Sequence, residues 1–370
     1  MLGPLLVLMG LAAPTVDGPM GGPQPPTLRV VCFTPADVEP PAGVQRRLTQ
    51  VADCAEGLIL RWMKHWKYEP AAARMFRRTD GGAVEVLLVK GQHPRASGRY
   101  DKPGFAGEVI DQATRMDGVA GRQNLWWIFV YLGDPPTRFA EYLGHGDAQG
   151  GGWALVNYDS RPGEIRPDEA LGVGFNETFT VKGCIHELGH AFGLPHLGPN
   201  PGKGLGNSLM GPNMGVYFAR SPRPRDGRVY LTEAAAAMLW KHPLFSGTAQ
   251  DRALLPDVRL EDYRARFDRA RRRVELTGKL VSNHPAHSVV VIDDIERRQG
   301  SYWSRSYAAR LQADGSFRVI IDEPVPADGL YRIVFCFQNG AVTGDGKGHG
   351  DQSAIVKSYR FNRGVLQFDP

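Results

Sequence analysis

GCIHELGHAFGLPH, residues 183–196, places three histidines and one glutamate in one short segment. Apolar residues before and within it recur at spacings of four, three and four: Val181, Ile185, Leu188 and Phe192. This period predicts a helix with one buried face that ends near Phe192. Gly193 follows, and a glycine at this point can adopt a left-handed conformation that ends the helix and turns the chain.

The three histidines of this segment have the spacing of a metal site. His186 and His190 are four residues apart, so on a helix they lie one turn apart on the same face. A third histidine on the next turn of the same helix would not reach the same ion. The turn at Gly193 lets His196 approach from another side. We therefore predict that His186, His190 and His196 bind one metal ion.

Glu187 gives this predicted site a chemical role. Three imidazoles leave the fourth tetrahedral position open to water, as a catalytic zinc site requires and a structural zinc site does not. Three imidazoles favour zinc among the divalent ions, and zinc lowers the pKa of such a water towards neutrality. Glu187, next to the first ligand, is placed to accept the water's proton and pass it to a leaving amine. The pattern predicts a zinc-dependent hydrolase with Glu187 as general base.

HELGHAFGLPH follows the pattern H-E-x-x-H-x-x-G-x-x-H and resembles the metzincin clan of zinc endopeptidases. Those proteins have a methionine turn below the metal, and NSLMG, residues 207–211, offers Met210 for it. The resemblance implies that Met210 forms a hydrophobic floor under the ligands. Several metzincins have a tyrosine two residues after that methionine, where this chain has Pro212. Either Tyr217 takes the place of that transition-state stabiliser, or no tyrosine takes part.

The resemblance also implies a fold for residues 27–250. It implies a metzincin-like catalytic domain of the α/β (α+β) class, with a twisted sheet, long helices and the zinc helix last before the methionine turn. The chain is most similar to bacterial secreted metzincin-like proteins that carry a C-terminal β-sandwich. The residues agree, because apolar strand-like runs alternate with helical periods. The predicted strands are 28–35, 83–91 and 124–133, and the predicted helices are 44–66 and 105–118.

The pattern changes after the helix predicted in LTEAAAAMLWKHPLF, residues 231–245, which Thr232 can cap and Pro243 stops. From residue 252 onward, strand-like runs are separated by Gly, Asp, Asn and Pro, and no helical period competes with them. This predicts an all-β sandwich of antiparallel strands. We therefore divide the chain into a leader, a zinc peptidase domain and a β-sandwich domain, at residues 1–26, 27–250 and 251–370.

Composition limits the partners and the compartment. The net charge of +5 comes from 44 basic and 39 acidic residues that are mostly interspersed, which gives no reason to expect a nucleic-acid partner. MLGPLLVLMGLAAPT at the N-terminus has an apolar stretch too short to span a bilayer, and it predicts a secretory signal peptide without a membrane span. Cys32 and Cys54 lie on a predicted strand and helix, where either a bridge or two buried thiols is compatible with the pattern.

Three further stretches bear on substrate binding. The strand GWALVNYD, residues 152–159, is predicted to be the sheet edge that pairs with an extended peptide, or an ordinary edge covered by a loop. GPNMGVYFAR, residues 211–220, is predicted to line the pocket for the residue after the cleaved bond. RARFDRARRR, residues 264–273, is either a solvated strand end or hairpin, or an anion-binding patch.

The remaining metal candidates are weaker. TGDGKGHGDQ, residues 343–352, contains Asp345 and Asp351 and could hold Ca²⁺ or be a flexible hairpin connection. Four other histidines lack ligand spacing, and we expect them at the surface: His145, His284, His287 and His349.

The sequence thus predicts a secreted zinc-dependent endopeptidase that acts on protein or peptide substrates. One alternative keeps the zinc chemistry but changes the substrate to a non-protein amide. Another makes the β-sandwich the working part of a surface-binding protein whose peptidase domain is vestigial. The intact glutamate argues against that second alternative, since a vestigial site should tolerate its loss. The sequence leaves the cleavage specificity, the activation step and the oligomeric state open.

Overall fold

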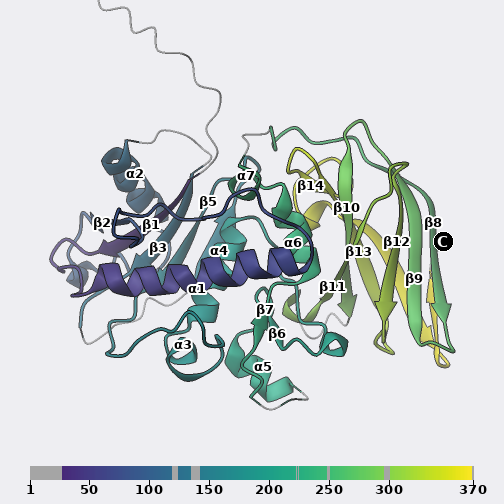
Figure 1. Ribbon diagram of the computed structural model, residues 1–370, viewed down its shortest axis with the longest axis horizontal. Helices are drawn as coiled ribbons and strands as arrows, with labels where there is room; N and C mark the ends of the chain where they lie inside the picture. Colours follow the sequence, from purple (N-terminus) through teal and green to yellow (C-terminus); the bar gives the residue numbers. More distant parts are fainter. Residues whose placement is uncertain are drawn as a thin grey trace, which may run out of the picture.

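The computed structural model describes residues 27–118, 124–134, 142–221, 223, 225–247, 251–295 and 301–368. The predicted signal peptide and flexible leader, residues 1–26, lie outside the described residues. The structure is mixed α/β, with a helix-covered sheet at one end and two antiparallel sheets at the other (Figure 1). Within the described residues, none of the helices combines the length and apolar character needed to cross a bilayer.

A five-stranded sheet forms the N-terminal part, in the order β2-β1-β3-β5-β4. Every side chain of the central strands β1 and β3 is buried, which explains why β3 is apolar throughout and β1 is apolar except for Arg29 and Thr34. Strands β2, β1, β3 and β5 run parallel, and β4 runs antiparallel to β5. The strands are β1 (Leu28–Thr34), β2 (Val86–Lys90), β3 (Leu125–Val130), β4 (Leu143–Gly146) and β5 (Gly152–Asn157).

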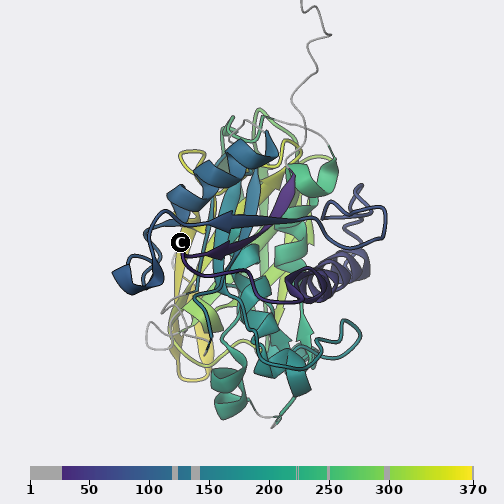
Figure 2. The same ribbon diagram turned by 90° about the vertical axis from the view of Figure 1, so that its left-hand side faces the viewer.

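Helices cover both faces of this sheet (Figure 2). The long helix α1 (Val44–His65) packs with the histidine-bearing helix on one face, and α2 (Ala106–Asp117) packs on the other. Both helices confirm the sequence prediction. Gly118 ends α2 in the left-handed region at φ 67°, the conformation for which glycine is favoured at this position.

The predicted edge strand is wrong. Residues 152–157 form β5, which pairs with β3 on one side and β4 on the other, so the outermost strand is β4. The sequence of β4, LGHG, is too short and too rich in glycine to have a strand pattern. Its glycines have a packing role, because a Cβ on Gly144 would lie 2.2 Å from the Glu187 carbonyl oxygen. The missing side chain brings the sheet edge directly against the helix with the histidines.

Among the residues that the structure describes, this part also contains five further α-helices, a two-stranded sheet and the short helices η1 (Arg95–Ser97) and η2 (Pro201–Lys203). Thr232 caps α6 by accepting a hydrogen bond from the Ala235 amide at 3.2 Å, as predicted. Pro243 does not simply stop that helix but also starts the next one, since proline suits the first turn of a helix. The elements are α3 (Gly174–Thr178), α4 (Val181–Ala191), β6 (Asn207–Ser208), α5 (Met214–Arg220), β7 (Val229–Tyr230), α6 (Glu233–Trp240) and α7 (Pro243–Ser246).

The C-terminal part consists of two antiparallel sheets around a shared hydrophobic cluster. The larger has the order β11-β10-β13-β15-β16, with β14 beside β13, and the smaller has the order β12-β9-β8. The arginine run spans the end of β8, a turn and the start of β9, so it is a strand end and hairpin. The strands are β8 (Arg259–Asp268), β9 (Arg273–Val281), β10 (Ala286–Ile295), β11 (Arg305–Arg310), β12 (Ser316–Asp322), β13 (Gly329–Phe337), β14 (Val342–Thr343), β15 (Ile355–Asn362) and β16 (Val365–Phe368).

The two parts share one core. Val290 and Ile292 of β10 belong to the same buried cluster as the alanines of α6, so the larger sheet packs its outer face on the N-terminal part. At the edge of this contact, the Arg310 guanidinium of β11 lies 3.6 Å from the ring centroid of Tyr68 and 4.4 Å from that of Trp240. The division at residue 250 into separate domains stays a prediction.

Four cysteines are buried as free thiols, so the alternative with a bridge between Cys32 and Cys54 is wrong. Both side chains lie in the hydrophobic cluster between the sheet and α1, where burial raises the pKa of each thiol to about 12. They are packing residues.

Candidate metal centre and its pocket

The helix α4 and the turn that follows it position the three histidines. His186 and His190 lie on α4, which ends at Ala191. Gly193 has φ 83°, its amide donates to the His190 carbonyl at 2.8 Å, and the Leu194 amide donates to the Gly189 carbonyl at 3.0 Å. This pair of bonds is a Schellman motif, the left-handed helix end for which glycine is favoured. The turn brings His196 back to the helix, as the sequence predicted.

The three imidazoles converge. The Nε2 atom of His190 lies 3.1 Å from Nε2 of His186 and 3.1 Å from Nε2 of His196. The other ring nitrogens are used by the backbone: Nδ1 of His186 donates to the Leu209 carbonyl at 2.9 Å, and Nδ1 of His190 donates to the Leu194 carbonyl at 2.7 Å. A carbonyl can only accept, so in both rings the proton is on Nδ1 and the Nε2 lone pair faces the other histidines.

Burial keeps these rings neutral. It lowers the pKa of His186 well below its ordinary value, lowers that of His190, and lowers that of His196 to about 4. Converging lone pairs on neutral imidazoles repel one another unless a cation lies between them. Among the residues that the structure describes, this is also the one group of three or more His, Cys, Asp or Glu side chains close enough to share an ion. The three histidines can therefore hold a metal ion.

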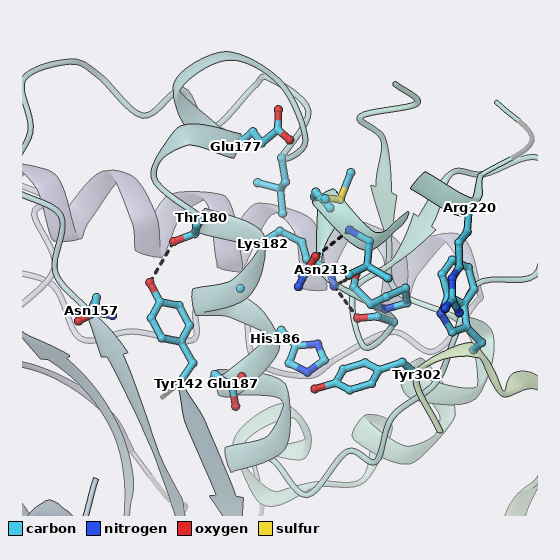
Figure 3. A pocket seen from close by; sticks show the side chains of 18 residues that line it. Tyr142, Asn157, Glu177, Thr180, Lys182, His186, Glu187, Asn213, Arg220 and Tyr302 are labelled. Carbon is cyan, nitrogen blue, oxygen red and sulfur yellow. Dashed lines mark hydrogen bonds between the residues drawn. The ribbon is translucent and has the colours of Figure 1, made fainter. Parts of the chain in front are cut away.

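Glu187 lies beside the histidines in a pocket lined by residues of both parts of the chain (Figure 3). Burial raises the pKa of its carboxyl group to about 7, while the nearby Lys182 ammonium and a hydrogen bond to the Gly144 backbone act in the opposite direction. A carboxyl group whose pKa is close to neutrality can both accept and release a proton near pH 7. This suits the predicted general base.

Lys182 was not singled out from the sequence. It lies one turn before His186 on α4, is 3% exposed, and donates from Nζ to the carbonyls of Gly211 at 2.6 Å and Pro212 at 2.7 Å. Burial lowers its pKa to about 7. Lys182 thereby ties the helix to the segment that follows Met210 and forms one wall of the pocket.

Met210 lies against the last turn of α4. It is 1% exposed, and a Cβ on Gly189 would lie 2.4 Å from its sulfur atom. The preceding residue, Leu209, provides the carbonyl that accepts from Nδ1 of His186. The segment around Met210 therefore supports the first histidine and packs under the helix that carries it.

Tyr302 and Trp303 reach this site from the C-terminal part. They lie in the short helix η3 (Ser301–Trp303) between β10 and β11. The Tyr302 ring stacks on His196 with 3.7 Å between centroids and an interplanar angle of 30°, and its hydroxyl points towards Glu187 (Figure 3). Tyr217, the sequence candidate, is instead buried in α5 with its ring against Phe218.

The pocket is a cavity of about 830 Å³, larger than one amino-acid side chain needs. It extends from Tyr142 and Asn157, past Lys182 and His186, to Tyr302 and Arg220 (Figure 3). Residues 211–216 and 220 line it and residues 217–219 do not, while a role for this stretch in receiving the residue after the cleaved bond stays a prediction.

The structure contradicts one further expectation from the sequence and gives no support to another. His287 is 7% exposed and packs on Trp240 with 4.8 Å between ring centroids, so its predicted place at the surface is wrong. The second carboxylate of the proposed calcium loop, Asp351, accepts from Arg332 at 2.7 Å. That ion pair uses Asp351, and the loop offers no support for calcium.

Comparisons with known proteins identify a fold. No protein-family model matches the chain, and no curated protein matches it in sequence. OgpA from Akkermansia muciniphila matches in structure with a TM-score of 0.69 and 20% identity, over 96% of this chain and 99% of that one. Catalytically inactive OgpA, crystallised in complex with the O-glycopeptide substrate glycodrosocin, matches with the same TM-score and 19% identity, over 97% and 100% of the two chains. The chain shares the fold of OgpA over nearly its whole length.

Proposed function

We propose that this protein is a zinc-dependent endopeptidase of the metzincin type. The observation that carries the proposal is the convergence of three Nε2 lone pairs beside Glu187, inside a cavity large enough for a substrate. His186, His190 and His196 would hold the zinc ion. Zinc supplies a Lewis acid that acidifies water and polarises a carbonyl group.

The side chains of the site carry out the proton transfers. Glu187 accepts the proton of the attacking water and then donates it to the nitrogen of the leaving amine. The Tyr302 hydroxyl, which points towards Glu187, is placed to donate a hydrogen bond to the oxyanion of the tetrahedral intermediate. Tyr302 thus takes the role for which the sequence offered Tyr217.

The surroundings favour a polypeptide substrate. The outermost strand β4 adjoins α4, and an extended peptide can add to such an edge through its backbone. The cavity has room for a group larger than a side chain. Because the structural neighbour OgpA has an O-glycopeptide substrate, we propose that the peptides include O-glycosylated ones. The predicted signal peptide would direct the enzyme out of the cytoplasm, and the C-terminal sheets would form a β-sandwich domain.

The test is the digestion of two peptide libraries, one plain and one O-glycosylated, by the purified mature protein, with products read by mass spectrometry. We expect cleavage that stops with a chelator, returns with zinc, and is absent in Glu187→Ala, while that variant still binds about one zinc ion per chain. Cleavage by Glu187→Ala at the wild-type rate would refute the mechanism. Zinc binding without cleavage of either library would favour a non-protein amide.

A further inference from the structure

The segment that follows the pocket wall is strongly basic. ARSPRPRDGR, residues 219–228, contains four arginines and one carboxylate, Asp226. Asp226 is already used, because it accepts from the Arg228 guanidinium at 2.8 Å. The side chains of Arg220, Arg223 and Arg225 are exposed, and no ion pair in the described part of the chain involves them. A local excess of positive charge therefore lies at the end of α5.

Arg220 joins this basic segment to the pocket. It lines the cavity together with Trp303, and its guanidinium carbon lies 5.9 Å from the centroid of the Trp303 ring. The indole also stacks on the buried Tyr217, with 6.5 Å between the ring centroids. A guanidinium beside an aromatic ring is restricted in the orientations that it can adopt, so it loses less conformational entropy when it binds an anion.

Apart from Arg220, the charged side chains that line the pocket offer no site for an anion. The Lys182 ammonium is buried and donates to two backbone carbonyls. Glu177 and Glu187 are carboxylates and would repel an anion. Figure 3 shows Glu177 and Arg220 on opposite sides of Asn213. Among the side chains that line the pocket, the exposed Arg220 guanidinium is therefore the cation available to an acidic group of a bound substrate.

We propose that Arg220 determines substrate specificity by binding a carboxylate of the substrate. This proposal rests on the peptidase function proposed above. The guanidinium can bind a carboxylate through two parallel hydrogen bonds, and Arg223 and Arg225 add a field that attracts it. Two sources have this chemistry: an acidic sugar on a glycan attached to the peptide, and an aspartate or glutamate side chain after the cleaved bond.

The experiment uses two matched pairs of peptides with the full-length mature enzyme. In one pair, the glycan on a threonine either is neutral or ends in sialic acid. In the other, an unglycosylated peptide has either Asn or Asp after the cleaved bond. We expect kcat/KM to be about three- to tenfold higher for the acidic member of at least one pair, mainly through KM, and less so at high salt. The pair that shows the preference identifies the source of the carboxylate.

The variants assign that preference to one side chain. Arg220→Gln should abolish it, and Arg220→Lys should restore part of it, since lysine keeps the charge but not the planar fork. Arg269→Gln is the matched control, because it removes the same charge from an exposed position in the β8–β9 turn. Arg269→Gln should leave the ratio of kcat/KM between the acidic and the neutral peptide of each pair unchanged. Equal kcat/KM within both pairs, or a preference that survives Arg220→Gln, would overturn the proposal.

A binding measurement separates this proposal from the proposed function. If the wild-type enzyme cleaves none of the four peptides, the peptidase proposal fails for these substrates. Fluorescence anisotropy with labelled peptides and the Glu187→Ala protein then still tests Arg220. Tighter binding of an acidic peptide that Arg220→Gln removes would support the anion site, and equal binding within both pairs would exclude it.

Discussion

At the scale of single residues, the chemistry depends on groups whose environments differ sharply from water. The histidines are neutral because they are buried, and their tautomers follow from two backbone carbonyls. Glu187 has a pKa near neutrality for the same reason, although Lys182 counteracts the shift. Burial thus keeps the histidine ligands neutral and raises the pKa of the glutamate beside them.

Tyr302 provides a test at this scale. Tyr302→Phe keeps the ring that stacks on His196 and removes only the hydroxyl. If that hydroxyl stabilises the oxyanion, kcat should fall by roughly a hundredfold, with zinc content and KM close to those of the wild type. The measurement is steady-state kinetics with metal analysis. Tyr217→Phe is the matched control and should change kcat little. A large fall in kcat in Tyr217→Phe, with little change in Tyr302→Phe, would instead assign stabilisation of the oxyanion to Tyr217.

At the scale of elements, α4 connects the ligands to the pocket wall. Gly193 ends the helix, Gly189 in its last turn packs on Met210, and Lys182 ties its first turn to the residues after Met210. One helix therefore determines both where the ion can bind and where the pocket wall stands.

Lys182→Met tests this connection. The change leaves the carbonyl of Gly211 without its donor in a buried place, and such a loss costs about 1–3 kcal/mol. We expect the pocket wall to shift, so that the Tm falls and KM for peptides rises while zinc stays bound. Thermal unfolding and kinetics would show both effects. Lys64→Met, at an exposed position of α1, should show neither. An unchanged KM in Lys182→Met would separate Lys182 from substrate binding.

A buried carboxyl group makes the C-terminal sheets sensitive to pH. Asp293 of β10 is 1% exposed and accepts from the Tyr359 hydroxyl at 2.5 Å. Burial raises its pKa from 3.8 to about 7, and Tyr359 and Arg305 only partly oppose the shift. The folded state thus binds this proton more tightly than the unfolded state does. Its contribution to stability is present below pH 4 and is lost as pH rises towards 7.

Asp293→Asn isolates this effect, because an amide cannot ionise. We expect the Tm of the variant, relative to that of the wild type, to rise between pH 5 and pH 8, by an amount that corresponds to at most about 4 kcal/mol. Thermal unfolding across this range with zinc held constant is the measurement. A Tm difference that stays constant with pH would mean that Asp293 ionises in the folded protein as it does in water.

At the scale of the whole molecule, the two parts depend on each other. They share a hydrophobic cluster, and η3 brings Tyr302 and Trp303 to the pocket. A chain of residues 27–250 would expose the apolar surface of α6 and lack both aromatic residues. We expect it to be insoluble or inactive, and solubility, circular dichroism and peptide cleavage would show this. A soluble fragment with wild-type activity would mean that the C-terminal part is dispensable.

The sequence could predict the features that depend on residues close together along the chain. Helices α1, α2 and α6 follow from local periods and caps, and His186, His190 and His196 come together through one helix and one turn. The edge strand was misplaced because LGHG in β4 is a strand only by virtue of its pairing with β5. Burial of His287 depends on Trp240, which no local pattern connects to it.

The sequence by itself determined the three converging histidines, the adjacent glutamate and the order of the main helices and strands, because hydrophobic period, helix pitch and the left-handed turn at Gly193 act over a few residues. Only the tertiary structure decided that β4 is the sheet edge, that Lys182 holds the pocket wall, and that Tyr302 and Arg220 reach the same cavity. These contacts join residues far apart along the chain. They exist because the two parts bury a common core, and no short stretch of sequence encodes that.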